Sequence, residues 1–247
     1  MTDPCLISPR WPAPERVRAF STTRQGGVSE DGYLGLNLGA RSGDTPARVE
    51  ENRRRLRHSA ALPSEPVWLT QVHGTKVISL DCPPDQAPEA DGAVTGSPGL
   101  VCAVLTADCL PVLLCDLDGT RVGVAHAGWR GLIGGVIENA VAGLNCKQDR
   151  IIAWLGPCIG QSAFEVGPEV RCAMLDFDSG CDAAMRPGSG DRWHIDLHAV
   201  ARRRLAMIGV EQVCVSDDCT YSDSRRFYSY RRDGVCGRMA TLIWLAA

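Results

Sequence analysis

Hydrophobic residues in the middle of the chain gather in short runs that turn residues separate. Two runs rich in valine and leucine, 100–105 and 111–115, flank the turn segment 106–109, and the runs 121–125 and 151–155 follow. Short apolar runs between turn signals are typical of buried strands. The pattern therefore predicts a buried sheet, and further strands are expected at 67–72, 76–80, 213–216 and 238–245.

Three segments show helical patterns instead. Apolar residues recur at helical spacing between 132 and 144 and again over 197–208, where Asp196 is suited to cap the first turn. Pro46 favours a helix start for 46–58, whose arginines are interleaved with glutamates as on a solvated helix face. The coarse pattern therefore mixes strands and helices.

Nothing in the sequence divides the chain. No internal repeat, low-complexity tract or long linker interrupts the 247 residues, and Pro83, Pro84 and Pro88 mark a loop. A chain of this length can bury a sizeable core. We therefore expect a single domain over residues 1–247.

Composition and charge exclude several classes of protein. Apolar residues are 45% and charged residues 22%, as in ordinary globular proteins and unlike disordered chains. The net charge of −3 gives no electrostatic reason to expect nucleic-acid binding. The longest stretch without a charged residue, 92–107, is too short and too rich in glycine to span a membrane.

Twelve cysteines raise the question of a disulfide framework. Such frameworks suit short secreted chains, whereas this chain is long and its first 20 residues hold four prolines and no apolar run of a signal peptide. We therefore expect a cytoplasmic protein with reduced thiols. Most of the cysteines should be buried as small apolar side chains, and one or two should carry chemistry.

Two of the five histidines lie where functional side chains are common. His73 precedes a glycine between two predicted strands, and His126 ends an apolar run before a glycine-rich segment. Cys109 also follows a predicted strand. The three residues are too widely spaced for a zinc finger, but three strand ends can together hold a catalytic metal with one open coordination position.

The residues alone leave this site open. A buried Cys109 that packs beside a hydrogen-bonded histidine explains the same pattern without a metal, and from spacing alone this is the preferable interpretation. His58, at a solvated helix end, and His198, within a helical pattern, are interpreted as structural.

Two further segments are candidates for ligand binding. Gly128 and Arg130 lie at a strand-to-helix transition whose backbone amides would suit an anion such as phosphate, although small residues also permit close helix packing. Tyr230 and Arg231 could bind a planar or anionic ligand. The pair at 233–234 is equally typical of a β-hairpin turn.

Taken together and in order, several strings resemble the YfiH family, whose members have been called polyphenol oxidases, laccase-domain proteins and purine nucleoside phosphorylases. The resemblance covers about residues 20–244, and the string that holds His126 is its most specific part. One departure is the cysteine at 236, where a threonine is expected before the glycine. The matching strings are TRQGGVS at 23–29, GLNLG at 35–39, QVHG at 71–74, ADG at 90–92, TADC at 106–109, AHAGWRG at 125–131, GPCIG at 156–160, FEVG at 164–167 and SYRRD at 229–233.

The resemblance implies an α/β fold of layered mixed sheets flanked by helices, a sandwich like that of cysteine hydrolases. It implies a zinc site whose ligands map onto His73, Cys109 and His126, with copper as an alternative occupant. It also implies phosphorolysis of adenosine, inosine and 5′-methylthioadenosine, with adenosine deamination by water in the same site. The expected partners are a nucleoside and phosphate, and neither nucleic acid nor a membrane.

Phosphorolysis requires phosphate near C1′ of the sugar and stabilisation of the charge that develops there or on the base. We expect Arg130 and the amides that begin at Gly128 to hold the anion. Asp108 is expected to support the metal ligands or to transfer a proton. The remaining pocket candidates are Asn37, Tyr230 and Arg231.

Other functions compete with this one. A copper-dependent polyphenol oxidase of the multicopper kind needs a larger set of histidines than the five present, which include no His-x-His pair. A metal-free cysteine hydrolase would use Cys109 as nucleophile and His126 or His73 as base. Some YfiH-like proteins have been linked to editing of peptidoglycan precursors, and a non-catalytic binding protein is the remaining alternative.

Overall fold

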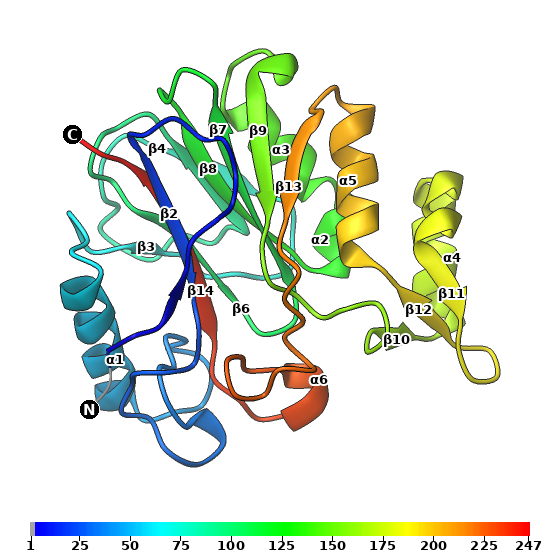
Figure 1. The fold of residues 1–247 in the computed structure, drawn as a ribbon, viewed down its shortest axis with the longest axis horizontal. Coiled ribbons are helices and arrows are strands. Elements are labelled where there is room, and N and C mark those ends of the chain that lie inside the picture. Colours follow the sequence, from blue (N-terminus) through cyan, green and yellow to red (C-terminus); the bar gives the residue numbers. More distant parts are fainter. Residues whose placement is uncertain (1–2) are drawn as a thin grey trace.

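The apolar runs of the central part of the chain pair into a six-stranded sheet in the order β13-β9-β7-β8-β5-β4 (Figure 1). In this computed structural model, which describes residues 3–247, β7 (Leu110–Asp116) pairs antiparallel with β8 (Val122–Ala127) and β9 (Ile151–Leu155). Every residue of these three strands is buried, which explains their largely apolar sequences. The remaining strands of this sheet are β4 (Val77–Leu80), β5 (Gly92–Thr95) and β13 (Gln212–Val215).

A five-stranded sheet brings the two ends of the chain together in the order β1-β2-β14-β6-β3. Its central strand β14 (Met239–Leu245) pairs antiparallel with β2 (Val17–Thr22) and with β6 (Cys102–Thr106). Its edges are β1 (Leu6–Ile7) and β3 (Val67–Trp68). The last strand therefore completes a sheet that begins near the N-terminus.

The two large sheets pack face to face through a shared apolar layer. Leu113 and Cys115 of β7 belong to the same buried cluster as Ile243 of β14. The alternate residues Val112 and Leu114 belong to a second cluster, which contains the helices on the outer face of the six-stranded sheet. Since side chains alternate along a strand, β7 contributes to both apolar layers.

Helices cover the outer faces of both sheets (Figure 1). On the six-stranded sheet lie α2 (Trp129–Gly134), α3 (Val136–Gly143) and α5 (Leu197–Met207), whose apolar residues join the larger cluster. On the five-stranded sheet, α1 (Pro46–Ser59) inserts Leu56 among apolar residues of β2 and β14. The observed architecture confirms the predicted single-domain α/β fold of layered mixed sheets flanked by helices.

A smaller lobe extends to one side of the two sheets, at the right of Figure 1. It contains a three-stranded sheet in the order β10-β12-β11 and the helix α4 (Pro168–Phe177). Its apolar residues belong to the same cluster as those of α3 and α5, so the lobe shares the main core. Its strands are β10 (Glu165–Val166), β11 (Met185–Pro187) and β12 (Trp193–Ile195), and short 3₁₀ helices elsewhere in the chain are η1 (Asp31–Tyr33), η2 (Gln148–Arg150) and η3 (Ser179–Ala184).

The structure differs from the sequence pattern in three places. The predicted strand 67–72 ends at Trp68. The predicted helix between 132 and 144 is two helices, because Gly135 takes a φ of +102° and breaks the segment. The alternative prediction of a hairpin turn at 233–234 is wrong, because Tyr230–Asp233 forms the short helix α6. The Ser229 side chain caps this helix by accepting a hydrogen bond from the Arg232 amide.

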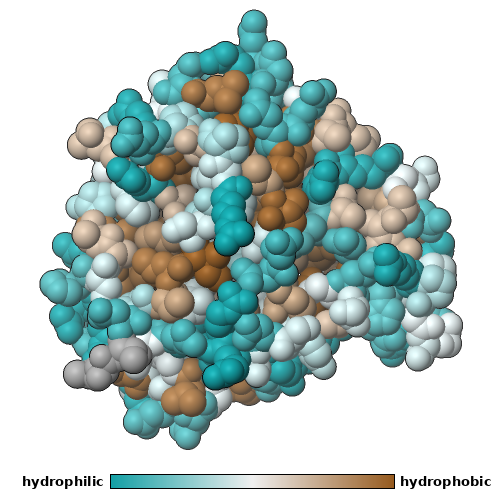
Figure 2. All heavy atoms as spheres, in the orientation of Figure 1, coloured by the Kyte–Doolittle hydropathy of each residue, from teal (hydrophilic) through white to brown (hydrophobic). Residues whose placement is uncertain are grey.

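The face shown in Figure 2 is mostly hydrophilic, with separate apolar patches, one of them over β2 and β14. Isolated apolar patches are ordinary on folded proteins. Within residues 3–247, no helix has both the length and the apolar composition needed to cross a membrane.

Candidate metal centre

Three side chains from distant parts of the sequence meet where the strands of the six-stranded sheet end, on one side of the sheet. The ligand atoms of His73, Cys109 and His126 all lie within 4.8 Å of one another. Leu110 of β7 pairs with Ala127 of β8, so Cys109, just before β7, and His126, near the end of β8, lie at the same end of these two strands. The structure thus brings together the three residues that the sequence singled out.

Asp91 joins the two histidines of this trio. One carboxylate oxygen accepts hydrogen bonds from His126 Nδ1 at 2.8 Å and from the His73 amide at 3.0 Å. The other accepts from the amides of Gly74 at 2.7 Å and Val72 at 3.2 Å. Because Nδ1 of His126 donates to Asp91, its Nε2 is the nitrogen left to bind a metal.

The loop that carries His73 is held in an uncommon backbone conformation. His73 has a φ of +59°, a region that few residues other than glycine occupy, and the Asp91 carboxylate is bonded to three amides across this turn. Gln71 fixes the start of the loop, since its side-chain amide exchanges two hydrogen bonds, at 2.7 and 2.8 Å, with the Leu105 backbone. The position of His73 therefore depends on Asp91 and Gln71.

Sequence reasoning gave no role to Asp91. The residue is fully buried and lies just before β5. Its own carbonyl also accepts the His126 amide at 2.7 Å, so both its backbone and its side chain position that histidine. The available signal was the string ADG at 90–92, which places an acidic residue at the start of a buried strand.

The charges of the site favour a thiolate beside an imidazolium. Burial acts to raise the pKa of Cys109, but the adjacent His126 and His73 lower the pKa to about 6. Burial acts to lower the pKa of His126, but Cys109 and Asp91 raise the pKa to about 9. The pKa of Asp91 is below its ordinary value, because hydrogen bonds from His126 and from backbone amides outweigh the effect of burial.

The residues fit a metal ion. Imidazole nitrogens and thiolates are both zinc donors, three protein ligands are usual in catalytic zinc sites, and the set of two histidines and one cysteine also binds copper. Gly128 keeps the site open, since a Cβ atom at this position would lie 3.0 Å from Cys109 Sγ and 3.2 Å from His73 Cδ2. The trio is therefore a candidate metal centre, and the absence of a side chain at Gly128 leaves space beside its ligands.

Asp108 precedes Cys109 in the sequence, and its carboxylate accepts hydrogen bonds from the C-terminal segments. One oxygen accepts from Thr220 Oγ1 at 2.6 Å, and the other accepts from Ser229 Oγ at 2.9 Å and from the Arg231 amide at 2.7 Å. The residue is buried with a φ of +87°. These bonds tie the Cys109 turn to the C-terminal segments, and a role in proton transfer stays a prediction.

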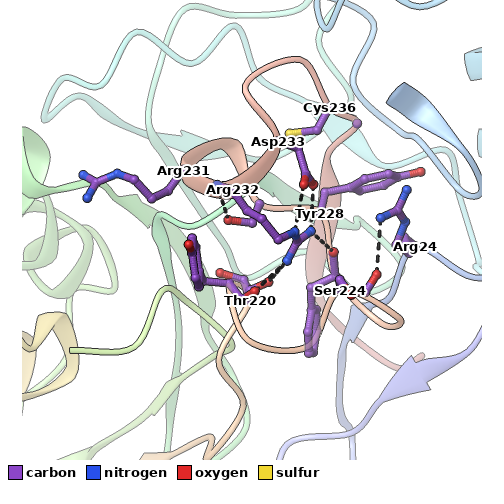
Figure 3. Close-up of polar contacts among 12 residues, drawn as sticks. Arg24, Thr220, Ser224, Tyr228, Arg231, Arg232, Asp233 and Cys236 are labelled. Carbon is purple, nitrogen blue, oxygen red and sulfur yellow. Dashed lines mark hydrogen bonds and ion pairs between the residues drawn. The ribbon is translucent and has the colours of Figure 1, made fainter. Parts of the chain in front are cut away.

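The two neighbouring arginines of the C-terminal block point in different directions (Figure 3). Arg231 extends away from Arg232 and donates to the Glu165 carbonyl at 2.6 Å. Arg232 donates to backbone carbonyls, among them that of Thr220 at 2.9 Å, and pairs with Asp233. Both arginines therefore hold loops in place.

The remaining predicted pocket residues lie in different settings. Asn37 is fully buried and donates to Ser42 Oγ at 2.8 Å and Asp44 Oδ2 at 2.9 Å, so it shapes the loop at 39–44. Arg130 stacks on the ring of Trp129, with 4.3 Å between the guanidinium carbon and the ring centroid. Neither Asn37 nor Arg130 is among the residues that line the cavity at the trio.

A cavity of about 610 Å³ opens at the trio. Tyr230 is 61% exposed and lines it together with Trp68, and contact of Tyr230 with a substrate stays a prediction. Sequence reasoning placed none of the cavity's arginines there, because they come from a loop, a helix and the segment before β14. The lining residues are Gly39, Ala40, Arg41, Ser42, Arg53, Trp68, Leu69, Thr70, Gln71, His73, Ala87, Leu105, Thr106, Ala107, Cys109, His126, Tyr230 and Arg238.

Known proteins are similar to almost the whole chain. A family model described as multi-copper polyphenol oxidoreductase laccase matches residues 18–246. Purine nucleoside phosphorylase YfiH of Escherichia coli (strain K12) is 52% identical over 240 residues, which cover 97% of this chain and 98% of that protein. Purine nucleoside phosphorylase PA4543 of Pseudomonas aeruginosa is 49% identical over the same length, with the same coverage.

A solved structure shows the same likeness in three dimensions. Protein NMB0706 of Neisseria meningitidis superposes with a TM-score of 0.94 at 42% sequence identity. The match covers 98% of this chain and 99% of that protein. The layered sheets, the side lobe and the segments that carry the trio therefore all fall within the shared fold.

Proposed function

The chain belongs to the family described as multi-copper polyphenol oxidoreductase laccase, with the YfiH proteins that its sequence resembles, and from this membership we propose a zinc-dependent purine nucleoside phosphorylase. Its substrates are adenosine, inosine and 5′-methylthioadenosine, and adenosine deamination is a second activity of the same site. The observation that carries the proposal is the trio of His73, Cys109 and His126 in the wall of a cavity of about 610 Å³. Small-molecule sites span about 300–1,000 Å³, so a nucleoside is of suitable size.

The residues of the chain divide the work of phosphorolysis. The bond between C1′ and the purine nitrogen breaks, an oxygen of hydrogen phosphate bonds to C1′, and the proton that the phosphate loses leaves on the purine nitrogen. Asp91 fixes the orientation of His126, and Trp68 and Tyr230 offer aromatic surface to the flat purine. His73, Cys109 and His126 would hold the zinc ion, which would supply Lewis acidity when bound.

A single metal ion suits the chain better than a multicopper cluster. The three remaining histidines lie elsewhere: His194 Nδ1 is 3.2 Å from the Gln161 carbonyl, His198 Nε2 is 2.9 Å from the Gly156 carbonyl, and His58 is exposed at the end of α1. Among the described residues, the trio is the one group of ligands that meets the geometric conditions for a metal. We therefore favour zinc over laccase chemistry.

A second function is favoured by one observation. Cys109, His126 and Asp91 are arranged in series, with a thiolate beside an imidazole that bonds to a carboxylate, as in cysteine hydrolases. Such an enzyme would need no metal, and peptidoglycan precursors are one substrate class that it could process. A metal-bound thiolate is no longer free to attack a substrate, so the two functions exclude each other.

Removal and return of zinc test the proposal. We expect a chelator to abolish the release of purine from the three nucleosides and stoichiometric zinc to restore it. His73→Ala should lower both phosphorolysis and deamination by at least about 100-fold, because the metal loses a ligand. The matched control is His58→Ala, which removes an exposed imidazole at the end of α1 and should leave both rates unchanged.

Two results would contradict the zinc proposal. Full activity after verified metal removal would favour the cysteine mechanism. Stoichiometric copper without zinc, in protein purified without added copper, would favour the oxidase.

A further inference from the structure

The cavity at the trio carries more positive charge than the rest of the molecule would suggest. Arg41, Arg53 and Arg238 line it, and no lining residue in the described chain is an aspartate or a glutamate. The protein as a whole has a net charge of −3. The cavity therefore concentrates cationic groups in a protein whose overall charge is negative.

None of these three arginines forms an ion pair with a residue in the described part of the chain. Ten of the 21 other arginines pair with a carboxylate and eleven form no such pair within the described chain, so the three are distinguished by sharing one cavity that has no acidic lining residue. The paired arginines are Arg48, Arg54, Arg55, Arg57, Arg150, Arg171, Arg203, Arg204, Arg226 and Arg232.

Two of the cavity arginines are held in place before any ligand binds. Arg53 donates from Nε and Nη2 to the Leu38 carbonyl, at 3.0 and 2.8 Å, and its guanidinium carbon lies 4.1 Å from the Trp68 ring centroid. Burial lowers the pKa of Arg53. No hydrogen bond leads from its Nη1 to any residue of 3–247, so one donor group remains for a ligand.

Arg238 is likewise held by backbone carbonyls and lies near an aromatic ring. Its Nη1 donates to the carbonyls of Cys236 at 2.7 Å and Gly237 at 2.9 Å. The guanidinium carbon lies 6.0 Å from the centroid of Tyr230. Its Nε and Nη2 make no hydrogen bond to the described chain.

Arg41 is the unattached member of the set. Its side chain is exposed and makes no hydrogen bond or ion pair with a described residue, although the loop that carries it is fixed. Ser42 Oγ donates to the Gly39 carbonyl at 2.7 Å, and Asn37 holds both Ser42 and Asp44. The guanidinium of Arg41 is therefore available to a ligand, and hydrogen bonds fix the backbone of the loop that carries it.

We propose that Arg41, Arg53 and Arg238 form an oxyanion subsite beside the metal centre and that it binds a phosphate group. This proposal rests on the proposed function and identifies the residues that receive its phosphate, in place of Arg130. Guanidinium groups match the geometry of phosphate oxygens, and such charge-assisted hydrogen bonds are stronger than neutral ones. The phosphate is either inorganic phosphate, as co-substrate, or the phosphate of a nucleotide substrate.

Calorimetric titration of the zinc-loaded enzyme with inorganic phosphate in chloride buffer is the test. Arg41→Ala should raise the Kd for phosphate at least about tenfold, and Arg41→Lys should recover part of the loss. Since Arg41 bonds to no other described residue, the substitution should leave the thermal unfolding temperature unchanged. The matched control is Arg202→Ala on α5, an exposed arginine away from the cavity, which should bind phosphate like the wild type.

Two ligands distinguish the sources of the phosphate. If the subsite takes inorganic phosphate, Arg41→Ala raises the KM for phosphate in purine release, while adenosine and adenosine 5′-monophosphate bind equally well. If the subsite takes a nucleotide, the monophosphate binds the wild type at least about tenfold more tightly than adenosine, and Arg41→Ala removes the difference.

The subsite and the proposed function can fail separately. Phosphate binding that depends on Arg41, in an enzyme that releases purine from no nucleoside, would keep the subsite and overturn the phosphorylase. Arg41→Ala binding both ligands as tightly as the wild type, or wild-type enzyme that binds neither, would overturn the subsite.

Discussion

At the scale of single residues, Asp91 determines the geometry of the candidate metal centre. Its two oxygens bond to His126, to the His73 amide and to two neighbouring amides, so that a single carboxylate positions two of the three ligands. The three residues of the trio were predictable as candidates, because histidine and cysteine at strand ends are conspicuous, although only the resemblance to the YfiH family implied that they bind a metal. Asp91 was not, since one acidic residue before a strand is common and only the fold shows what it reaches.

Replacing Asp91 with asparagine tests this role. The new side chain would keep the size of the old one but lose the negative charge that orients His126 and accepts the loop amides. We expect Asp91→Asn to weaken zinc binding by about 10–100-fold, the usual effect of losing such a partner. Competition with a chromophoric chelator measures the affinity.

The matched control for this substitution is Asp116→Asn. Asp116 is also buried and accepts hydrogen bonds from Thr120 and Arg121 in the turn after β7, away from the trio. Its replacement should lower stability and leave zinc affinity unchanged. Equal zinc affinity in Asp91→Asn and the wild type would show that the carboxylate does not position the ligands.

At the scale of elements, the sequence predicted the buried strands better than the connections. The apolar runs that became β7, β8 and β9 carry a strong local signal. The break between α2 and α3 does not, because the apolar spacing continues across Gly135 and only the φ of +102° ends the first helix. The short helix α6 was equally hidden, since the turn signal of the Asp-Gly pair at 233–234 outweighed the cap at Ser229.

Gly135→Ala tests the break between these two helices. A Cβ atom at this position would come no closer than 3.6 Å to another group, so the cost is that of the positive φ alone. We expect the free energy of unfolding in urea to fall by about 1–2 kcal/mol. An increase in stability would mean that α2 and α3 fuse into the continuous helix that the apolar spacing predicts.

At the scale of the whole molecule, the cavity is assembled from segments that span most of the chain. The loop at 39–42, α1, the His73 loop, the Cys109 turn, β8 and the segment from Tyr230 to Arg238 all contribute to it. The pairing of β14 with β2 and β6 brings the last of these segments to the first. Periodicity could predict the layers but not this convergence, which is why Arg41, Arg53 and Arg238 were recognised only in the fold.

The formation of ribose 1-phosphate tests the central claim most directly. Zinc-loaded enzyme is incubated with inosine, with and without inorganic phosphate, and hypoxanthine, ribose 1-phosphate and free ribose are separated by chromatography. We expect hypoxanthine and ribose 1-phosphate in equal amounts, and only when phosphate is present. Hypoxanthine with free ribose in both conditions, or no hypoxanthine in either, would contradict the account.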